Sequence, residues 1–160
     1  MMSEPRIGGE QYKLAFGVST NDGSGAVSYF IGASIESIKL VAKAETSTDQ
    51  IIVVFSGWPG ESELVLLDDD GQCCEERFIT AETDDLDYYV GATLLDVEVS
   101  DVAVNDEPEA LHEVRFLNIH TSKGVVTFAT HNKHNGYYGG FDICALRRKC
   151  VSYYDTGKVV

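Results

Sequence analysis

Basic residues and long apolar runs are both scarce in this sequence. Only 12 lysines and arginines accompany 26 acids in 160 residues, which gives a formal net charge of −14. Nonspecific binding of nucleic acid needs a basic surface, and so does binding to an anionic membrane, so we expect neither partner. No apolar run reaches the roughly 20 residues of a membrane helix. The first six residues lack the pattern of a secretory signal, which predicts a soluble, cytoplasmic protein.

The common signatures of catalytic and metal sites are absent as well. The sequence contains no Gly-x-Ser-x-Gly elbow, Walker loop, HExxH motif or GxGxxG motif. Its four cysteines are Cys73, Cys74, Cys144 and Cys150, and no two of them form a CxxC pair. A zinc site that combines cysteines with His131 and His134 therefore lacks the usual ligand spacing. We expect a protein that is not an enzyme and needs no cofactor or metal.

Segments of strand type dominate what is present. Eight stretches rich in β-branched or aromatic residues are separated by turn formers and not by long crossover helices, which favours antiparallel pairing. The predicted strands are 12–18, 34–42, 50–55, 63–67, 93–99, 114–120, 125–130 and 141–146. We therefore predict a mainly β (α+β) fold of twisted antiparallel sheets in one domain, 1–160. It would comprise an N-terminal β half (10–70), a C-terminal β half (71–147) and a tail (148–160).

Helical structure is expected only in one or two short turns. Residues 83–91 carry acids in the first turn, a capping candidate at Thr83 or Asp84, and Gly91 to end the helix. A similar short helix is expected before Gly32.

The residues around these two glycines resemble one another. Phe-Ile-Gly-Ala-Ser-Ile at 30–35 parallels Tyr-Val-Gly-Ala-Thr-Leu at 89–94. The echo suggests a duplicated turn-strand unit, and chance similarity between two short β segments is the alternative. Residues 101–110 are acidic and contain a proline, and we interpret them as an exposed loop.

Charge is strongly segregated along the chain. Residues 61–113 contain 18 of the 26 acids and a single base, Arg77, for a local net charge of −17. Residues 114–160 contain seven bases and two acids, for a net charge of +5. An anionic ligand would be tolerated best in this basic third, whereas the acidic block could imitate nucleic acid.

The densest feature of the basic third is the run HNKHNGYYGG at 131–140. Asn-Gly favours a tight turn, and the pair Gly139-Gly140 permits close approach of backbone or of a ligand. One interpretation is a hairpin turn with Tyr137 and Tyr138 packed on a sheet. The other is a platform on which a ligand stacks.

Binding fits the residue types of this region better than catalysis does. A nucleotide needs a stacking surface, amide groups and a donor for each phosphate. The rings of Tyr137 and Tyr138 could stack, and the amides of Asn132 and Asn135 both donate and accept. The candidates for phosphate are Lys133, Arg115, Arg147 and Arg148. His131 and His134 could serve acid–base chemistry, although hydrogen bonds to the turn or to a ligand are the simpler role.

Several motifs in order resemble a family of small phage and bacterial domains described only as domains of unknown function. They are Cys73-Cys74-Glu75, Leu-x-x-x-x-Gly-Ala from Leu86 to Ala92, Thr121-x-Lys123-Gly124, and Asn-x-x-Asn-Gly-Tyr-Tyr-Gly-Gly from Asn132 to Gly140. The resemblance covers about residues 72–146.

The layout is also similar to phage anti-Thoeris sponge proteins, which are small β-rich oligomers that sequester cyclic ADP-ribose-type immune signals without cleaving them. This similarity implies a homo-oligomer and a ligand site at Asn132, Asn135, Tyr137 and Tyr138, with Phe128 on the preceding strand. It places no basic residue at the ligand.

Three hypotheses follow. The first is a phage-type anti-defence protein that sequesters a small (cyclic) nucleotide immune signal in the host cytoplasm without cleaving it. The alternative is an acidic nucleic-acid mimic or interaction protein that inhibits a host defence protein through residues 61–113. The third is a structural β domain without a ligand. The response of the protein to a panel of nucleotides separates the first hypothesis from the other two.

Overall fold

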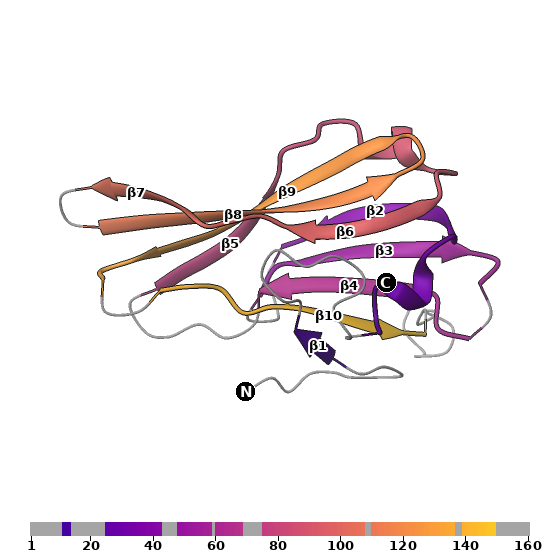
Figure 1. Ribbon diagram of the computed structural model, residues 1–160, viewed down its shortest axis with the longest axis horizontal. Helices are drawn as coiled ribbons and strands as arrows, with labels where there is room; N and C mark the ends of the chain where they lie inside the picture. The colour runs from indigo at the N-terminus through magenta and orange to yellow at the C-terminus, as the bar shows by residue number, and fades with distance from the viewer. Residues whose placement is uncertain are drawn as a thin grey trace.

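Two antiparallel sheets make up the fold, and each takes strands from both halves of the chain (Figure 1). The computed structural model describes residues 11–13, 25–42, 48–58, 60–68, 75–107, 110–136 and 139–149. Within these residues, sheet A has the order β1 (Gln11–Lys13), β10 (Ile143–Arg148), β4 (Glu63–Asp68), β3 (Gln50–Ser56), β2 (Ser34–Val41). Sheet B has the order β5 (Glu75–Ala81), β9 (Gly124–His134), β8 (Ala110–Thr121), β6 (Leu94–Val99), and β7 (Ala103–Glu107) also pairs with β8. The predicted mainly β, antiparallel architecture is confirmed.

The apolar run of β4 explains why the centre of sheet A is buried on both faces. All six residues of β4 are buried, and a strand covered on both sides loses the alternation of polar and apolar residues. Leu64 and Leu66 belong to the main core, whereas Val65 and Leu67 belong to a second cluster with Cys144 and Leu146.

The main core lies between the sheets. Phe30 stacks on Phe55 with ring centroids 4.5 Å apart, and Leu117 and Phe128 belong to the same cluster from sheet B. Burying each such side chain contributes about 1.5–3 kcal/mol. Phe128, which the sequence suggested as a ligand contact, is 0% exposed in this core. Its position gives it a packing role.

The junction between the sheets repeats the same contacts twice. Gly32 N donates to Leu94 O at 2.9 Å, and Gly91 N donates to Ile35 O at 2.7 Å. The two contacts are related by a shift of 59 residues along the chain, because Gly91 corresponds to Gly32 and Leu94 corresponds to Ile35. The φ angles of the two glycines are 91° and 92°, and both following strands carry a bulge, between Ile35 and Ser37 and between Leu94 and Asp96.

These matched contacts favour duplication over chance similarity. Each glycine follows a short 3-10 helix, η1 (Ser28–Phe30) and η2 (Leu86–Tyr89). Positive φ costs a side-chain-bearing residue about 1–2 kcal/mol, which explains glycine at both positions. β2, β3 and β4 of the first copy then correspond to β6, β8 and β9 of the second copy by their pairing order.

The strand that follows each copy joins the other sheet. β5 follows β4 in the chain but pairs with β9 of sheet B, and β10 follows β9 but pairs with β4 of sheet A. The two copies therefore exchange their fourth strands. The boundary predicted at residue 71 falls in this first crossing, at residues outside the described ones.

Two parts of the chain differ from the prediction. Residues 101–110, interpreted as a loop, contain β7, which pairs with the start of β8. The acids and the proline argued against a strand here. β7 pairs with β8 at the edge of the sheet, and an edge strand tolerates charged residues that a central strand would exclude. β5 was also not predicted, since its sequence EERFITA starts with three charged residues.

The short helices are confirmed as single 3-10 turns, but their caps differ from the prediction. The residue that precedes η2 is Asp85, and it makes no side-chain cap bond. Thr83 Oγ1 instead accepts a hydrogen bond from Thr127 N at 2.9 Å. In the part of the chain that the structure describes, no helix has the length and apolar character needed to cross a membrane.

Candidate functional site

The predicted binding residues of β9 lie on two opposite faces of sheet B. Side chains alternate along a strand, so Asn132 and His134 share the inner face with Phe128, whereas His131 and Lys133 lie on the outer face. Asn132 is 0% exposed and His134 is 6% exposed, while Lys133 is exposed. The alternation could have been applied to the sequence before the structure, and it shows that the four residues do not form one site.

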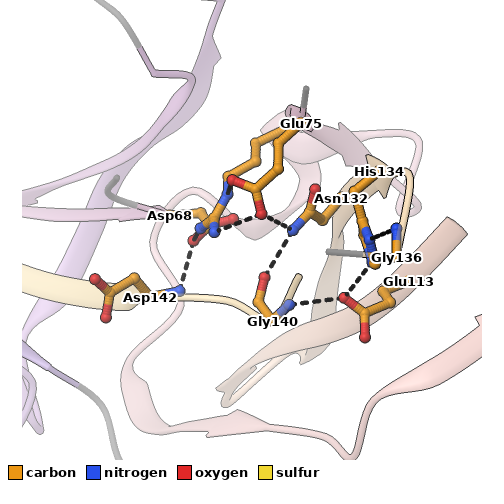
Figure 2. A network of polar contacts seen from close by, with 9 residues as sticks. Asp68, Glu75, Glu113, Asn132, His134, Gly136, Gly140 and Asp142 are labelled. Carbon is orange, nitrogen blue, oxygen red and sulfur yellow. Dashed lines mark hydrogen bonds and ion pairs between the residues drawn. The ribbon is translucent and has the colours of Figure 1, made fainter. Parts of the chain in front are cut away.

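The inner face of sheet B is apolar at one end and polar at the other. β8 and β9 continue beyond the end of β4, together with β7, as Figure 1 shows at the left. On this extension β8 contributes Glu113, β5 contributes Glu75 and Arg77, and β9 contributes Asn132 and His134. The segment 139–142 closes over these side chains in place of sheet A (Figure 2).

A buried ion-pair network joins the two sheets at this point. Arg77 Nη1 lies 2.9 Å from Asp68 Oδ1, and its Nη2 lies 3.3 Å from Glu75 Oε2. Asn132 Nδ2 donates to Glu75 Oε2 at 3.0 Å and to the carbonyl of Gly140 at 2.9 Å. The guanidinium and the amide thus tie β4, β5 and β9 to the segment after the turn.

Asp68 is a buried carboxyl of this network. Its Oδ1 also accepts a hydrogen bond from Asp142 N at 2.7 Å. Burial raises the pKa of Asp68 to about 6, because the backbone hydrogen bond and Arg77 only partly offset the loss of hydration. Asp68 Oδ2 and Asn132 Oδ1 are buried without a hydrogen-bond partner. Both atoms are acceptors, so the network has room for a donor and none for a further anion.

His134 and Glu113 hold the turn on both sides of the two tyrosines. Gly136 N donates to His134 Nδ1 at 3.0 Å. On the other side, Gly140 N donates to Glu113 Oε1 at 2.7 Å, and the same oxygen lies 3.1 Å from His134 Nε2 (Figure 2). A hydrogen bond to the turn, the simpler role considered for His134, is therefore observed.

Gly139 is required by close approach to side chains of the protein itself. A Cβ at this residue would lie 3.0 Å from the His134 ring and from Glu113 Oε1. Tyr137 and Tyr138, the predicted stacking pair, lie outside the described residues. Asn135 is exposed on the approach to the turn.

The run 131–140 is not a hairpin. β9 ends at His134 in sheet B, and β10 starts at Ile143 in sheet A, where it pairs with β4 and β1. The hairpin interpretation is wrong because the Asn-Gly turn starts a crossing between sheets.

His131 belongs to a separate cluster on the outer face of sheet B. Its ring stacks on Phe78 with centroids 4.4 Å apart. Its Nδ1 lies 2.9 Å from His112 Nε2, and its Nε2 lies 2.9 Å from Thr80 Oγ1. Burial, and then repulsion from His112, lower the pKa of His131. Lys133 Nζ lies 5.7 Å from the centroid of the Phe78 ring on the same face.

The arginines proposed for phosphate are engaged within the protein. Arg147 pairs with Glu61 at 2.9 Å and lies over the ring of Tyr29, and Arg148 pairs with Glu63 at 2.7 Å. Arg115 Nε donates to the carbonyl of Ser100 at 3.0 Å. Bases of the C-terminal third thus neutralise acids of the block 61–113 across neighbouring strands, which explains part of the charge segregation.

Sequence reasoning missed the residues that organise the network, namely Asp68, Glu75, Arg77 and Glu113. One signal was present, because Arg77 is the single base among 18 acids. A lone base in such a block is well placed to bind several carboxylates at once, as Arg77 does here.

The side chains of the network hold backbone groups in place. Among the described residues, no group of three or more histidines, cysteines or acids is placed to hold a metal ion. Each donor of Asn132 and the acceptor nitrogen of His134 is used on the segment 136–140 or on a neighbouring strand.

Comparison with known proteins finds no match among curated proteins or among solved structures. A family model does match residues 28–143, which span η1 to the first residue of β10 and include every residue of the polar network. The chain belongs to this family, the domain of unknown function DUF7448.

Proposed function

We propose that the protein is a non-catalytic, phage-type anti-defence protein that sequesters a small cyclic or linear nucleotide at the turn of residues 135–140. The observation that carries the proposal is the double anchoring of this turn by His134 and Glu113, on both sides of Tyr137-Tyr138. Gly136 and Gly140, on the two sides of the tyrosine pair, are thus already held in place before a ligand binds, which lowers the entropy cost of binding. Stacking of a base on an aromatic ring contributes about 1–3 kcal/mol.

The proposed ligand is recognised through rings and amides more than through phosphate charge. Arg147 and Arg148 pair with acids, so they contribute little to the binding of an anion. Asn135 lies exposed beside the turn. Sequestration without cleavage agrees with a site whose polar groups are spent on holding backbone. The similarity to anti-Thoeris sponge proteins suggests cyclic ADP-ribose isomers and a homo-oligomer as the first cases to test.

The test is a thermal-shift and calorimetric titration with linear nucleotides, cyclic dinucleotides and cyclic ADP-ribose isomers. We expect saturable binding by one class and recovery of the intact compound by mass spectrometry after the protein is heated. Tyr137→Ala and Tyr138→Ala should weaken binding at least tenfold. Tyr88→Ala is the matched control, because Tyr88 is 57% exposed on η2 in another part of the molecule. Absence of any shift across the panel, or recovery of a hydrolysed product, would contradict the proposal.

A second candidate function is suggested by the surface around η2. Asp84, Asp85 and Asp87 are exposed there, next to Tyr88 and Val90, which are 57% and 42% exposed. An apolar patch beside unpaired acids suits a basic protein partner, such as a nucleic-acid-binding defence protein. Triple charge reversal at the three aspartates should then abolish inhibition while nucleotide binding is kept. Asp68 is unsuitable for this test because it is buried in the ion-pair network.

A further inference from the structure

The hydrogen bonds around His134 determine which nitrogen carries its proton. A backbone N–H can only donate, so the bond from Gly136 N identifies Nδ1 as an acceptor without a proton. Nε2 then carries the proton and donates to Glu113 Oε1. The neutral imidazole with its proton on Nε2 is the form that fits both partners.

A second proton on the ring would convert this acceptor into a donor. Nδ1–H and the N–H of Gly136 would then point at each other, so the bond that fixes the start of the turn would be lost. The bond to Glu113 would persist and become charge-assisted. The two ends of the turn therefore respond differently to the same proton, because Gly140 N is bound to Glu113 and not to the ring.

From these contacts we infer that His134 is a proton-operated clasp of Gly136, which it releases when the ring becomes an imidazolium. Resting on the proposed function, we also expect the affinity for the nucleotide to fall at acid pH. The charged groups around the ring are Glu113 from β8 and Glu75, which is opposite His134 in register on β5. Lys133, its neighbour in β9, points to the other face, and Gly139 and Gly140 bring no charge.

NMR spectroscopy of the ¹⁵N-labelled full chain from pH 8 to pH 5 tests the clasp without any ligand. We expect the Nε2–H tautomer at pH 8, a Gly136 amide signal that follows the titration of the His134 ring, and about fivefold faster intrinsic-corrected exchange of that amide in acid, as expected for loss of one hydrogen bond. In His134→Gln the Gly136 signal should not titrate. His120→Gln is the matched control, because His120 pairs with Glu98 on the outer face of sheet B.

A second variant keeps the test decisive if His134→Gln does not fold. Glu113→Gln still accepts both hydrogen bonds but has lost its charge, so the common midpoint of Gly136 and His134 should move to lower pH. An Nδ1–H tautomer at pH 8, a Gly136 signal that stays constant while the ring titrates, or an unchanged midpoint in Glu113→Gln would each overturn the clasp. A flat nucleotide panel together with a titrating Gly136 would instead reject the proposed ligand and leave the clasp in place.

Discussion

The two copies of the duplicated unit are nearly identical at their start and very different at their end. Both begin with a 3-10 turn, a glycine with positive φ and a bulged strand. Counted by register from the bulges, Asp68 at the end of β4 corresponds to Thr130 in β9. β4 stops there, whereas β9 continues through His131–His134. Asn132 and His134 of the candidate site lie in this extension, which the first copy lacks, so the second copy carries the shared scaffold with one strand lengthened by polar residues.

The largest effect should come from the core that both copies share. Leu66 of β4 and Phe128 of β9 correspond in register and are both 0% exposed. Leu66→Ala should lower the free energy of unfolding by about 2–5 kcal/mol and Phe128→Ala by about 3–5 kcal/mol. Urea denaturation followed by fluorescence and by circular dichroism should give one coincident transition for each variant. Separate transitions for the two copies would break the view that they share one core.

The second effect tests the difference between Asp68, the charged last residue of β4, and Thr130, its uncharged counterpart in β9. The pKa of Asp68 is raised from 3.8 to about 6, so the stability that its protonated form contributes is present below pH 4 and lost as pH rises through 6. Relative to Asp68→Asn, the wild type should lose about 2 kcal/mol between pH 4 and pH 7. Unfolding free energies of both proteins at pH 4, 5, 6 and 7 give this difference. A difference that does not change with pH would show that Asp68 has an ordinary pKa.

The third effect measures the symmetry of the junction. Gly32→Ala and Gly91→Ala each place a side chain at positive φ, which costs about 1–2 kcal/mol. A Cβ meets nothing within 4 Å at Gly32 and only the tip of Lys123, at 3.8 Å, at Gly91. Backbone strain should therefore be the sole source of destabilisation, and the two variants should lose equal free energy of unfolding within about 0.5 kcal/mol. Asparagine at the same positions should be milder. Strongly unequal losses would reject the equivalence of the two junctions.

The smallest effect concerns two tyrosines that correspond in the repeat, each beside a cation. Arg147 lies 4.4 Å from the ring centroid of Tyr29, and Lys123 lies 5.5 Å from that of Tyr88. Arg147→Met and Lys123→Met should each cost about 0.5–1 kcal/mol. Thermal unfolding in low and high salt resolves such differences. If neither variant lost thermal stability, the contacts between these cations and the tyrosine rings would make no measurable contribution to folding.

The sequence alone predicted the sheets and the short helices, but not how the segments meet. Alternating or continuous apolar runs predicted β2, β3, β4, β6, β8, β9 and β10 to within a few residues, because burial leaves a local pattern. β5 and β7 were missed since edge strands with charged residues lack that pattern. The equivalence of Gly32 and Gly91 was visible as a weak echo.

The candidate site was only partly predictable. The run 131–140 contains Asn132 and His134, which the structure places in the polar network, and strand alternation would have separated His131 from His134. Asp68 and Glu75 are far from Glu113 and from the turn in the sequence, and all three look like ordinary surface acids, so only the crossing of β10 to sheet A brings them to the turn. Long-range placement of this kind leaves no periodic trace in a single sequence.

The exchange of β5 and β10 has a practical consequence for anyone who wishes to cut this protein into parts. A fragment that ended near residue 70 would keep β2, β3 and β4 but lose β10, and β4, which is buried along its whole length, would become an open edge that invites aggregation. The complementary fragment would supply the missing strand. Mixed together, the two pieces should reconstitute one molecule, as split reporters do, whereas neither half should stay in solution alone.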